Sequence, residues 1–404
     1  MNNGKLAIYG GPKIRKKPLP YRKLFDEEEL ENVKRVFKDS WREGVDFGYQ
    51  GKYEKLYTDK FCDFQGGGFA DAVSSGTAAV YLALKAFDIE PGNDVIVSPV
   101  TNPGSVTPAV IQGMNIVIAD SAPDSFNIGP DEFEKALTSD TRAAILTHLG
   151  GQPIDIEPII EIAKSRGIKV IEDCSQAHGA LYKGERVGRF GDIAASSTMF
   201  SKTLATGGCG GLVYMQNEDY YWLIRSLADR GKHFRLPDFD FRDTGQCLFP
   251  ALNFNLDELS CAIGLSILSR LQSIIDKRLE ITAKIDTSLE ASSVVFPCRS
   301  RDDCKPSPFF HTVGVAVDKL KVSKKEFAKA VAAEGIWINP HYSQLVSEWK
   351  WLHKYVKNGL KTPNARRFRD RTFNLLFNEK FSDGEVEDII SSVVKVESFF
   401  KKDR

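Results

Sequence analysis

The chain has 404 residues, of which 42% are hydrophobic and 27% are charged, and its 54 basic side chains balance its 54 acidic ones. Balanced charge gives no basic surface for nucleic acid or an anionic membrane, so we expect neither as a partner. The sequence lacks a run of 18 apolar residues and an apolar signal-peptide core near its start, and we therefore expect a cytoplasmic protein.

A chain of this length is too long for one hydrophobic core, and its pattern divides it into an arm and two domains. Residues 1–25 are basic and proline-bearing, which predicts an extended N-terminal arm. We expect residues 26–264 to form a large domain, which begins with helices over 27–38 and 53–64. Residues 265–404 are expected to form a smaller domain, joined by a long helix whose apolar spacing begins at Leu256.

Short apolar strands alternate with amphipathic helices through the large domain. The expected strands are at 71–73, 94–98, 115–120, 143–149, 169–172, 194–198 and 211–216, and the expected helices at 76–87, 105–112, 131–137, 158–166 and 218–230. This alternation predicts an α/β fold with a mostly parallel sheet between helices. The last two strands are too close in sequence for a helical crossover, so one of them should be antiparallel. The smaller domain is expected to be α+β, with strands at 312–317 and 336–339 and helices at 324–333 and 385–399.

The turn Ser74-Ser-Gly-Thr-Ala-Ala lies where a strand passes into a helix. Gly76 frees the backbone, and the N–H groups of Thr77 and Ala78 would lie at the positive end of the helix. This arrangement suits a phosphate group. Plain N-capping of the helix by a serine is the alternative interpretation.

Asp173 is expected at the carboxyl end of a buried parallel strand, the edge at which open α/β sheets bind ligands. A carboxylate there could hold a ring nitrogen in its protonated state, and Gln176 could donate a hydrogen bond to a ring substituent. Capping of the following segment is the alternative role of Asp173. For His178 we favour a hydrogen-bonded structural histidine over a ligand-binding one.

Lys202 lies between two apolar strands and is followed by a run of glycines and small residues, Gly207 to Gly211. Burial of an ammonium group is costly, so such a lysine is normally neutral, paired or covalently used. We interpret Lys202 as an amine at the floor of a cofactor site, and a lysine in a surface turn is the alternative.

A phosphate-binding turn, a carboxylate and a buried lysine at the strand ends of one sheet are the parts of a pyridoxal phosphate (PLP) site. Lys202 would bind the cofactor covalently, Asp173 would pair with its pyridine nitrogen, and the turn at 74–78 would bind its phosphate. A metal site is not expected, because the seven cysteines and six histidines lack metal-ligand spacing. The cysteines should be free thiols.

Several motifs resemble the DegT/StrS family: V-S-S-G-T-A-A, G-N-D-V-I-V-S, D-S-F-N-I, T-H-L-G-G-Q-P, V-I-E-D-C-S-Q-A-H-G-A, F-S-K and N-F-N-L-D-E-L. The resemblance covers residues 20–285 well and the remainder loosely. These proteins are fold-type I PLP enzymes, with a mostly parallel sheet of the seven-stranded type, that aminate nucleotide-linked keto sugars and related cyclitols.

The resemblance implies a role for several residues. Lys202 would form the aldimine with the cofactor, Asp173 would contact the pyridine nitrogen, and Gln176 would lie near the ring hydroxyl. The residues implied at the phosphate are Ser75, Gly76, Thr77 and Ser197. Asn253 would reach the phosphate of the partner subunit's cofactor, which implies a homodimer with composite active sites.

Three positions depart from the family pattern. Asn102 takes the place of an aromatic residue that stacks on the cofactor ring, so either the ring loses this stacking partner or the flanking Pro103 covers its face. Cys209 replaces an acidic residue of the glycine run, and Asn255 replaces an arginine. We expect these departures to leave the core chemistry intact, and they leave the identity of the substrate open.

The expected activity is transfer of an amino group from an amino acid, with glutamate as the expected donor, to a nucleotide-linked keto sugar through a pyridoxamine phosphate stage. Candidate substrate contacts are His233 and Arg235, in a basic and aromatic segment over 230–250, and His341 and Tyr342. The segment 230–250 could instead form a subunit interface. Alternative functions are a cyclitol aminotransferase, a sugar 3-dehydratase, whose relatives carry histidine in place of the lysine, and a non-catalytic regulator.

Overall fold

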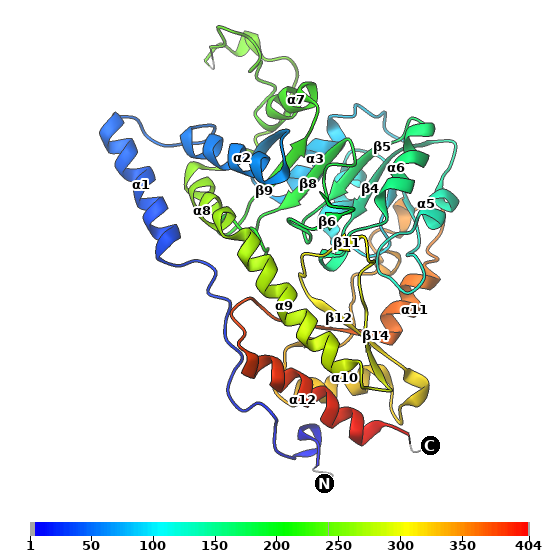
Figure 1. The fold of residues 1–404 in the computed structure, drawn as a ribbon. Helices are drawn as coiled ribbons and strands as arrows, with labels where there is room; N and C mark the ends of the chain where they lie inside the picture. The colour runs from blue at the N-terminus through cyan, green and yellow to red at the C-terminus, as the bar shows by residue number, and fades with distance from the viewer. Residues whose placement is uncertain (1–4, 241, 403–404) are drawn as a thin grey trace.

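The computed structural model describes residues 5–240 and 242–402. Residues 1–4 of the expected arm, Phe241 in the segment 230–250, and residues 403–404 of the expected small domain lie outside this part. A seven-stranded sheet and a four-stranded sheet organise the described chain (Figure 1). A ribbon of three short strands also pairs a segment of the C-terminal part, β11 (Cys304–Lys305), with β6 (Leu181–Tyr182) and β7 (Glu185–Arg186) of the N-terminal part.

The seven-stranded sheet has the strand order β1-β9-β8-β5-β4-β2-β3. Its strands are β1 (Phe69–Val73), β2 (Asp94–Val97), β3 (Asn115–Ile118), β4 (Thr141–Thr147), β5 (Lys169–Asp173), β8 (Ile193–Ser197) and β9 (Gly211–Met215). Among these described strands, β9 alone runs antiparallel to its neighbours. The mostly parallel sheet with one antiparallel member is therefore confirmed.

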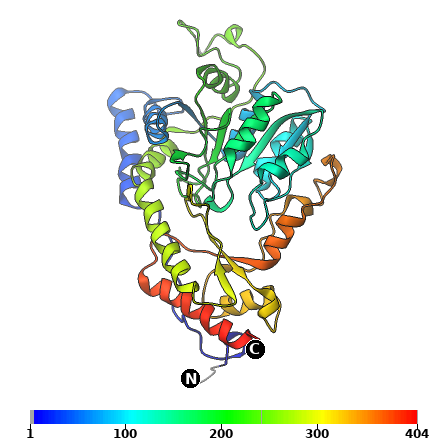
Figure 2. The ribbon, with the colours of Figure 1, turned by 45° about the vertical axis from the view of Figure 1, so that its right-hand side comes forward.

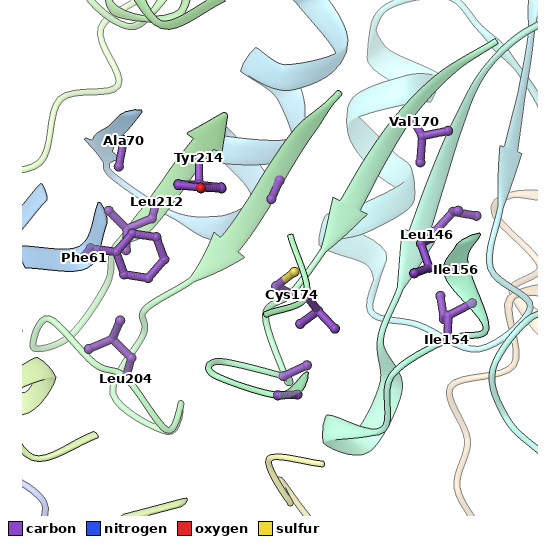
Figure 3. Packing of buried hydrophobic residues seen from close by; sticks show 14 of the residues in the cluster. Phe61, Ala70, Leu146, Ile154, Ile156, Val170, Cys174, Leu204, Leu212 and Tyr214 are labelled. Carbon is purple, nitrogen blue, oxygen red and sulfur yellow. The ribbon is translucent and has the colours of Figure 1, made fainter. Parts of the chain in front are cut away.

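Helices cover both faces of this sheet, because successive side chains of each strand point to opposite sides. Leu146 and its neighbour Ile145 on β4 accordingly belong to two separate buried clusters. Figure 3 shows the first cluster, in which Phe61 lies beside Tyr214 and Ile156 lies beside Leu146. The helices of the first face are α2 (Lys52–Gln65), α5 (Pro130–Ala136), α6 (Ile156–Ser165) and α8 (Glu258–Ser269), and those of the second are α3 (Gly76–Lys85), α4 (Pro103–Ile111) and α7 (Glu218–Ala228).

The long helix expected from Leu256 is two helices, α8 and α9 (Leu271–Leu289), with a bend of 53° between them. The break falls at Arg270, whose backbone leaves the helical region (φ −113°, ψ 7°). The guanidinium of Arg270 donates to the Leu24 carbonyl and pairs with Glu28 and Glu29, so it faces the N-terminal segment at the bend. Apolar spacing alone could not locate this break, since it continues across both helices.

The four-stranded sheet has the order β10-β12-β14-β13 and is antiparallel throughout. Its strands are β10 (Val295–Pro297), β12 (His311–Val315), β13 (Ile338–Asn339) and β14 (Thr372–Leu375). Helix α9, α10 (Lys324–Ala333) and α12 (Asp383–Phe400) share its buried cluster. Figures 1 and 2 show α9 running from the large sheet to this smaller one, with α12 packed beside it.

Among the strands and α-helices described in the C-terminal part, β10, β11, β14 and α11 (Pro363–Arg371) were not expected from the sequence. Helix α11 passes into β14 without a turn residue, so no glycine or proline marks the boundary. Between these elements the chain returns to the large sheet, where Val346 N–H donates to the Pro99 carbonyl at 2.9 Å and Leu352 joins the second cluster. The expected boundary at 264/265 falls inside α8.

The described part of the N-terminal arm, residues 5–25, is extended except for a short 3-10 turn, η1 (Ala7–Tyr9). It packs on the C-terminal part, where Arg15 pairs with Glu385 and Asp388, each at 2.8 Å. A capping box then begins α1 (Glu27–Glu43), which extends to Gly44 rather than ending near residue 38 as expected.

No single helix within residues 5–240 and 242–402 has the length and hydropathy of a membrane span, although α8 and α9 meet the criterion when joined across their bend.

Candidate active site

A cavity of about 200 Å³ lies at the carboxyl edge of the parallel strands. Most of the sequence-predicted cofactor residues line it, namely Ser75, Gly76, Thr77, Asn102, Asp173, Gln176, Ser197 and Lys202. They come from the segments that follow β1, β2, β5 and β8, which the sheet topology brings to one edge.

One end of the cavity is the N-terminus of α3. The Ser75 hydroxyl accepts a hydrogen bond from the Ala78 N–H at 3.1 Å, so the capping interpretation of this serine is correct. The N–H groups of Gly76 and Thr77 have no hydrogen-bond partner among the described residues. A side chain at position 76 would lie 2.5 Å from the Ser197 Cβ, so only glycine allows the helix to approach β8 this closely. Two free N–H groups at a helix N-terminus can bind an anion.

The opposite end holds Asp173, which is buried with 3% of its surface exposed. Its carboxylate accepts hydrogen bonds from the Ser105 hydroxyl and, at 3.0 Å, from the Ser175 N–H. Asp173 therefore caps the following turn and also lines the cavity. Thr101 extends this network by donating to Ser105 at 2.9 Å, which fixes the hydroxyl that faces the carboxylate.

Gln176 is oriented by a backbone contact, because its Oε1 accepts a hydrogen bond from the Gly150 N–H at 2.8 Å. Its amide then lies near the phenol of Tyr342. Burial raises the pKa of this tyrosine to about 12, and the interaction with Gln176 acts in the opposite direction. Tyr342 also packs against the rings of Phe126 and Phe310, so it belongs to an aromatic cluster next to Gln176 and does not itself line the cavity.

Lys202 follows β8 in a bend, and its side-chain amine has no hydrogen-bond partner among the described residues. The Nζ atom lies 4.9 Å from the centre of the Phe309 ring. Burial lowers the pKa of Lys202, and the nearby negative charge of Asp173 partly opposes this shift. The alternative of a lysine in a surface turn is therefore wrong.

His178 is buried beside this lysine, and neither of its ring nitrogens is in hydrogen-bond geometry with a described residue. The Ser197 backbone nevertheless interacts with the ring, so the expectation of a hydrogen-bonded structural histidine stays a prediction. Desolvation, followed by the positive charges of Lys202 and Arg22, lowers the pKa of His178 to about 3, although the Ser197 backbone acts against the shift. The imidazole is consequently uncharged at neutral pH.

The remaining predicted residues lie outside the cavity. Asn253 is exposed, and its Oδ1 accepts hydrogen bonds from the backbone and side chain of Asn255. His233 belongs to the same segment as Arg235, which pairs with Asp219 at the start of α7. His341 lies beside Lys324, with 3.5 Å between Nδ1 and Nζ.

Asn102 lines the cavity and caps α4, where its Oδ1 accepts the Gly104 N–H at 3.1 Å. Cys209 lines the opposite wall and is exposed. Sequence reasoning missed Ser105 and Phe309. Ser105 has a usable signal, since it lies in the first turn of the helix that follows β2, whereas Phe309 comes from a distant part of the sequence.

One group of potential metal ligands, His148, Glu172 and Cys174, is buried behind Asp173 with its ligand atoms within 4.8 Å of one another. His148 and Glu172 already take part in hydrogen bonds with other groups. His148 accepts the Ile154 N–H and contacts Glu172 at 3.0 Å. Three further backbone N–H groups, from residues 188, 190 and 191, donate to Glu172. This group braces the end of β5, and the absence of a metal stays a prediction.

Comparison with known proteins places this geometry in a family. The family model of the DegT/DnrJ/EryC1/StrS aminotransferase family matches residues 23–394. The chain belongs to this family. Its fold class and its class as an aminotransferase, both expected from the sequence, are thereby confirmed.

The similarity to individual members of the family extends over nearly the whole chain. The spore coat polysaccharide biosynthesis protein SpsC of Bacillus subtilis is 29% identical over 381 residues, which are 93% of this chain and 96% of that protein. A dTDP-3-amino-3,6-dideoxy-alpha-D-galactopyranose transaminase of Aneurinibacillus thermoaerophilus is 29% identical, covering 91% and 95%. An aminotransferase from Psychrobacter cryohalolentis superposes with a TM-score of 0.86 at 25% identity, covering 95% of this chain and 99% of that one.

The family implies PLP, and the residues of the cavity fit this cofactor. The free N–H groups of α3 suit a phosphate, and the carboxylate of Asp173 suits a protonated ring nitrogen. The same cavity is lined by the amine of Lys202, whose pKa is lowered by burial and which has no hydrogen-bond partner among the described residues. Amines of this kind form covalent bonds with aldehydes.

Proposed function

We propose that this protein transfers an amino group from an amino acid, with glutamate as the expected donor, to the keto group of a nucleotide-linked sugar, using PLP and its pyridoxamine form. The observation that carries the proposal is the amine of Lys202. It is largely buried, it has no hydrogen-bond partner among the described residues, and it lines the same cavity as the N-terminus of α3 and the carboxylate of Asp173.

Bound PLP supplies an electron sink that stabilises the negative charge left when the donor or product loses a proton from carbon. Lys202 binds the cofactor covalently and, once released, moves this proton. Its burial lowers its pKa and so increases the fraction of free amine available near neutral pH. Asp173 holds the ring nitrogen protonated, and its contacts with Ser105 and Ser175 fix its direction.

The remaining cofactor contacts follow from the positions of the side chains. Gly76, Thr77 and Ser197, next to the capping residue Ser75, bind the phosphate at the end of α3. Gln176 contacts the ring hydroxyl. Asn102 has no aromatic ring and its side chain caps α4, so it would not stack on the cofactor ring.

The acceptor is proposed from the relatives, one of which is by name a transaminase of a dTDP-linked amino sugar. Tyr342 is the best placed of the four proposed substrate residues, since it lies beside Gln176. His233, Arg235 and His341 lie farther away, and their contact with the nucleotide or sugar would require a partner subunit or a rearranged loop. The proposal places the enzyme in the cytoplasm, where its seven free cysteines stay reduced.

We further propose a homodimer with composite active sites. Exposed apolar side chains lie close in sequence to the proposed cross-subunit residue Asn253 and to Lys202, with Leu252 exposed by 59% and Phe200 by 58%. Exposed apolar patches of this kind are typical of protein interfaces. The exposure of Asn253 agrees with a role in the partner's site.

The test is an assay of the PLP-loaded protein with L-glutamate or L-glutamine and a panel of nucleotide-linked keto sugars. Transfer releases the keto acid of the donor and gives a product that has gained nitrogen. Loss of oxygen without gain of nitrogen would instead identify a sugar 3-dehydratase, and transfer to a keto cyclitol alone would identify a cyclitol aminotransferase. A protein that binds PLP but does not react with either donor would contradict the proposal and favour a regulatory role.

A further inference from the structure

A carboxylate is buried between two arginines at the junction of the arm, α9 and the loop after β14. Glu379 Oε1 accepts a hydrogen bond from Nε of Arg22 at 2.8 Å. Its other oxygen, Oε2, accepts from Nε of Arg278 at 3.0 Å and pairs with the second nitrogen of that guanidinium at 2.9 Å. The exposed fractions of the side chains are 16% for Arg22, 7% for Glu379 and 4% for Arg278. We call these residues the arginine–glutamate triad.

The first arginine of the triad holds the backbone of the lysine. Arg22 donates to the Lys202 carbonyl at 2.5 Å and to the Thr203 carbonyl at 3.2 Å. A guanidinium is planar and presents its donors in fixed directions, so it can bind the carboxylate and both carbonyls at once. A residue of the N-terminal arm therefore fixes the bend that carries Lys202.

The second arginine holds the segment that covers the lysine. Arg278 donates to the Pro308 carbonyl at 3.0 Å and contacts the Phe309 carbonyl at 3.4 Å. The ring of Phe309 is the one that lies 4.9 Å from the Lys202 amine. One carboxylate thus connects the bend that carries the amine with the ring beside it.

Because the triad consists of buried charges, the loss of any one member should destabilise the arrangement of the other two. Burial would raise the pKa of Glu379, but the positive charges of Arg278 and Arg22 outweigh this effect and lower it. Removal of one partner of a buried ionic group leaves the others uncompensated. Asn378, next to Glu379, also donates to the Pro20 carbonyl at 2.9 Å, so the same loop binds the arm at two points. Figures 1 and 2 show the arm passing along the C-terminal part on its way to α1.

We propose that Glu379, through Arg22 and Arg278, is a positioning residue for Lys202, and that docking of the arm by Arg22 completes the active site. The expected effect on the reaction rate rests on the function proposed for Lys202. The expected ordering of the bend that carries Lys202 and of the segment that carries Phe309 does not rest on it. If the triad only stabilised the fold, its removal would not disorder the segment around Lys202 more than the rest of the molecule. A positioning role predicts a local loss of order and a lower rate with little change in substrate affinity.

The experiment compares Arg22→Ala with Arg15→Ala in the full chain. Arg15 is a matched control, because it is another arm arginine, with 12% exposure, and pairs with Glu385 and Asp388 away from the cavity. Amide hydrogen exchange of the protein without added cofactor reports the order of residues 199–206 and 305–310. The second measurement is the rate at which the PLP-loaded protein reacts with L-glutamate, at several donor concentrations and pH values.

We expect Arg22→Ala to increase exchange in residues 199–206, and to lower the limiting rate by about 10- to 100-fold, the usual cost of a small misplacement at a reacting centre. The donor concentration for half-maximal rate should change little, and the pH profile of the rate should shift because Lys202 is differently exposed. Arg15→Ala should reproduce none of these effects. Arg22→Lys should recover only part of the rate, since lysine keeps the charge but lacks the planar donors.

Glu379→Gln is the second variant and should resemble Arg22→Ala. Equal exchange, rate and pH profile in Arg22→Ala and Arg15→Ala would overturn the inference, provided that the wild-type protein reacts. If the wild-type protein binds no PLP at Lys202, the proposed function fails instead. In that case, amide hydrogen exchange in residues 199–206, compared between Arg22→Ala and Arg15→Ala, still tests whether Arg22 positions this segment.

Discussion

One side of the cavity, which contains Ser75, Asp173 and Gln176, is the edge of the large sheet, whereas the other side, with Lys202 and Phe309, consists of loops. The residues of the sheet side are held by contacts within the large domain, namely the Ser175 N–H and the Ser105 hydroxyl on Asp173 and the Gly150 N–H on Gln176. The loop side is held by residues far along the chain. Arg22 is 180 positions from Lys202, and Arg278 is 30 positions from Pro308.

Because of this difference, we expect the sheet side to determine cofactor binding and the loop side to determine the rate of the reaction. A parallel sheet presents its strand ends at one edge whatever the rest of the molecule does, so under the proposed function the sheet side would be a preformed site for the phosphate and ring of the cofactor. The position of the amine depends on the packing of the arm and the C-terminal part on the loops. Substitutions on the sheet side should therefore weaken cofactor binding, whereas those on the loop side should reduce the reaction rate.

The largest expected effect is that of Lys202→Ala, which removes the reacting amine of the loop side. Turnover should fall by about 10²–10⁴-fold or more, the usual contribution of a positioned acid–base group. Non-covalent PLP should still bind at the sheet side, which dialysis against radiolabelled PLP would measure. Lys183→Ala is the control, since Lys183 is half-exposed and pairs with Glu157 on the surface. Normal turnover in Lys202→Ala would refute the assignment.

The next effect concerns the buried histidine beside Lys202. Its pKa is about 3 in the folded protein, whereas an unfolded histidine titrates near pH 6.5. Between these values the unfolded chain binds the additional proton, so the free energy of unfolding falls as the pH decreases, by about 1.4 kcal/mol per unit for this group.

His178→Asn removes this contribution, so the stability difference between wild type and variant should shrink by about 2–3 kcal/mol when the pH is lowered from 7.5 to 4.5. Urea unfolding at both pH values measures it. His353→Asn, at an exposed position, is the control. If the difference stays constant with pH, His178 binds its proton in the folded protein as readily as in the unfolded chain, and its pKa is not lowered by folding.

The smallest effect tests the sheet side. Ser75→Ala removes the cap of α3, and Ser323→Ala removes the equivalent cap of α10, at a cost of about 1 kcal/mol each. Both variants should lose similar stability in thermal unfolding, but only Ser75→Ala should bind PLP more weakly, by a few-fold. Equal PLP affinity in the two variants would contradict a role of the α3 N-terminus in phosphate binding.

The sheet side could be predicted from the sequence because its signals are local. Strand runs followed by Ser75 or Asp173 identify both the element and its edge, and the glycine run identifies the loop that carries Lys202. The network around Lys202 could not be predicted, since Arg22 and Glu379 are 357 positions apart and each resembles an ordinary surface charge in the sequence. The burial of His178 and the break at Arg270 depend on tertiary packing in the same way.

The central claim is that Lys202 binds PLP and is released by an amino donor. The most direct test is the visible absorbance spectrum of the protein incubated with PLP, recorded before and after addition of L-glutamate, in wild type and Lys202→Ala. Wild type should show the band of a lysine-bound cofactor and lose it to the shorter-wavelength band of the amine form when glutamate is added. Absence of the lysine-bound band in wild type, or the same band in Lys202→Ala, would contradict the claim.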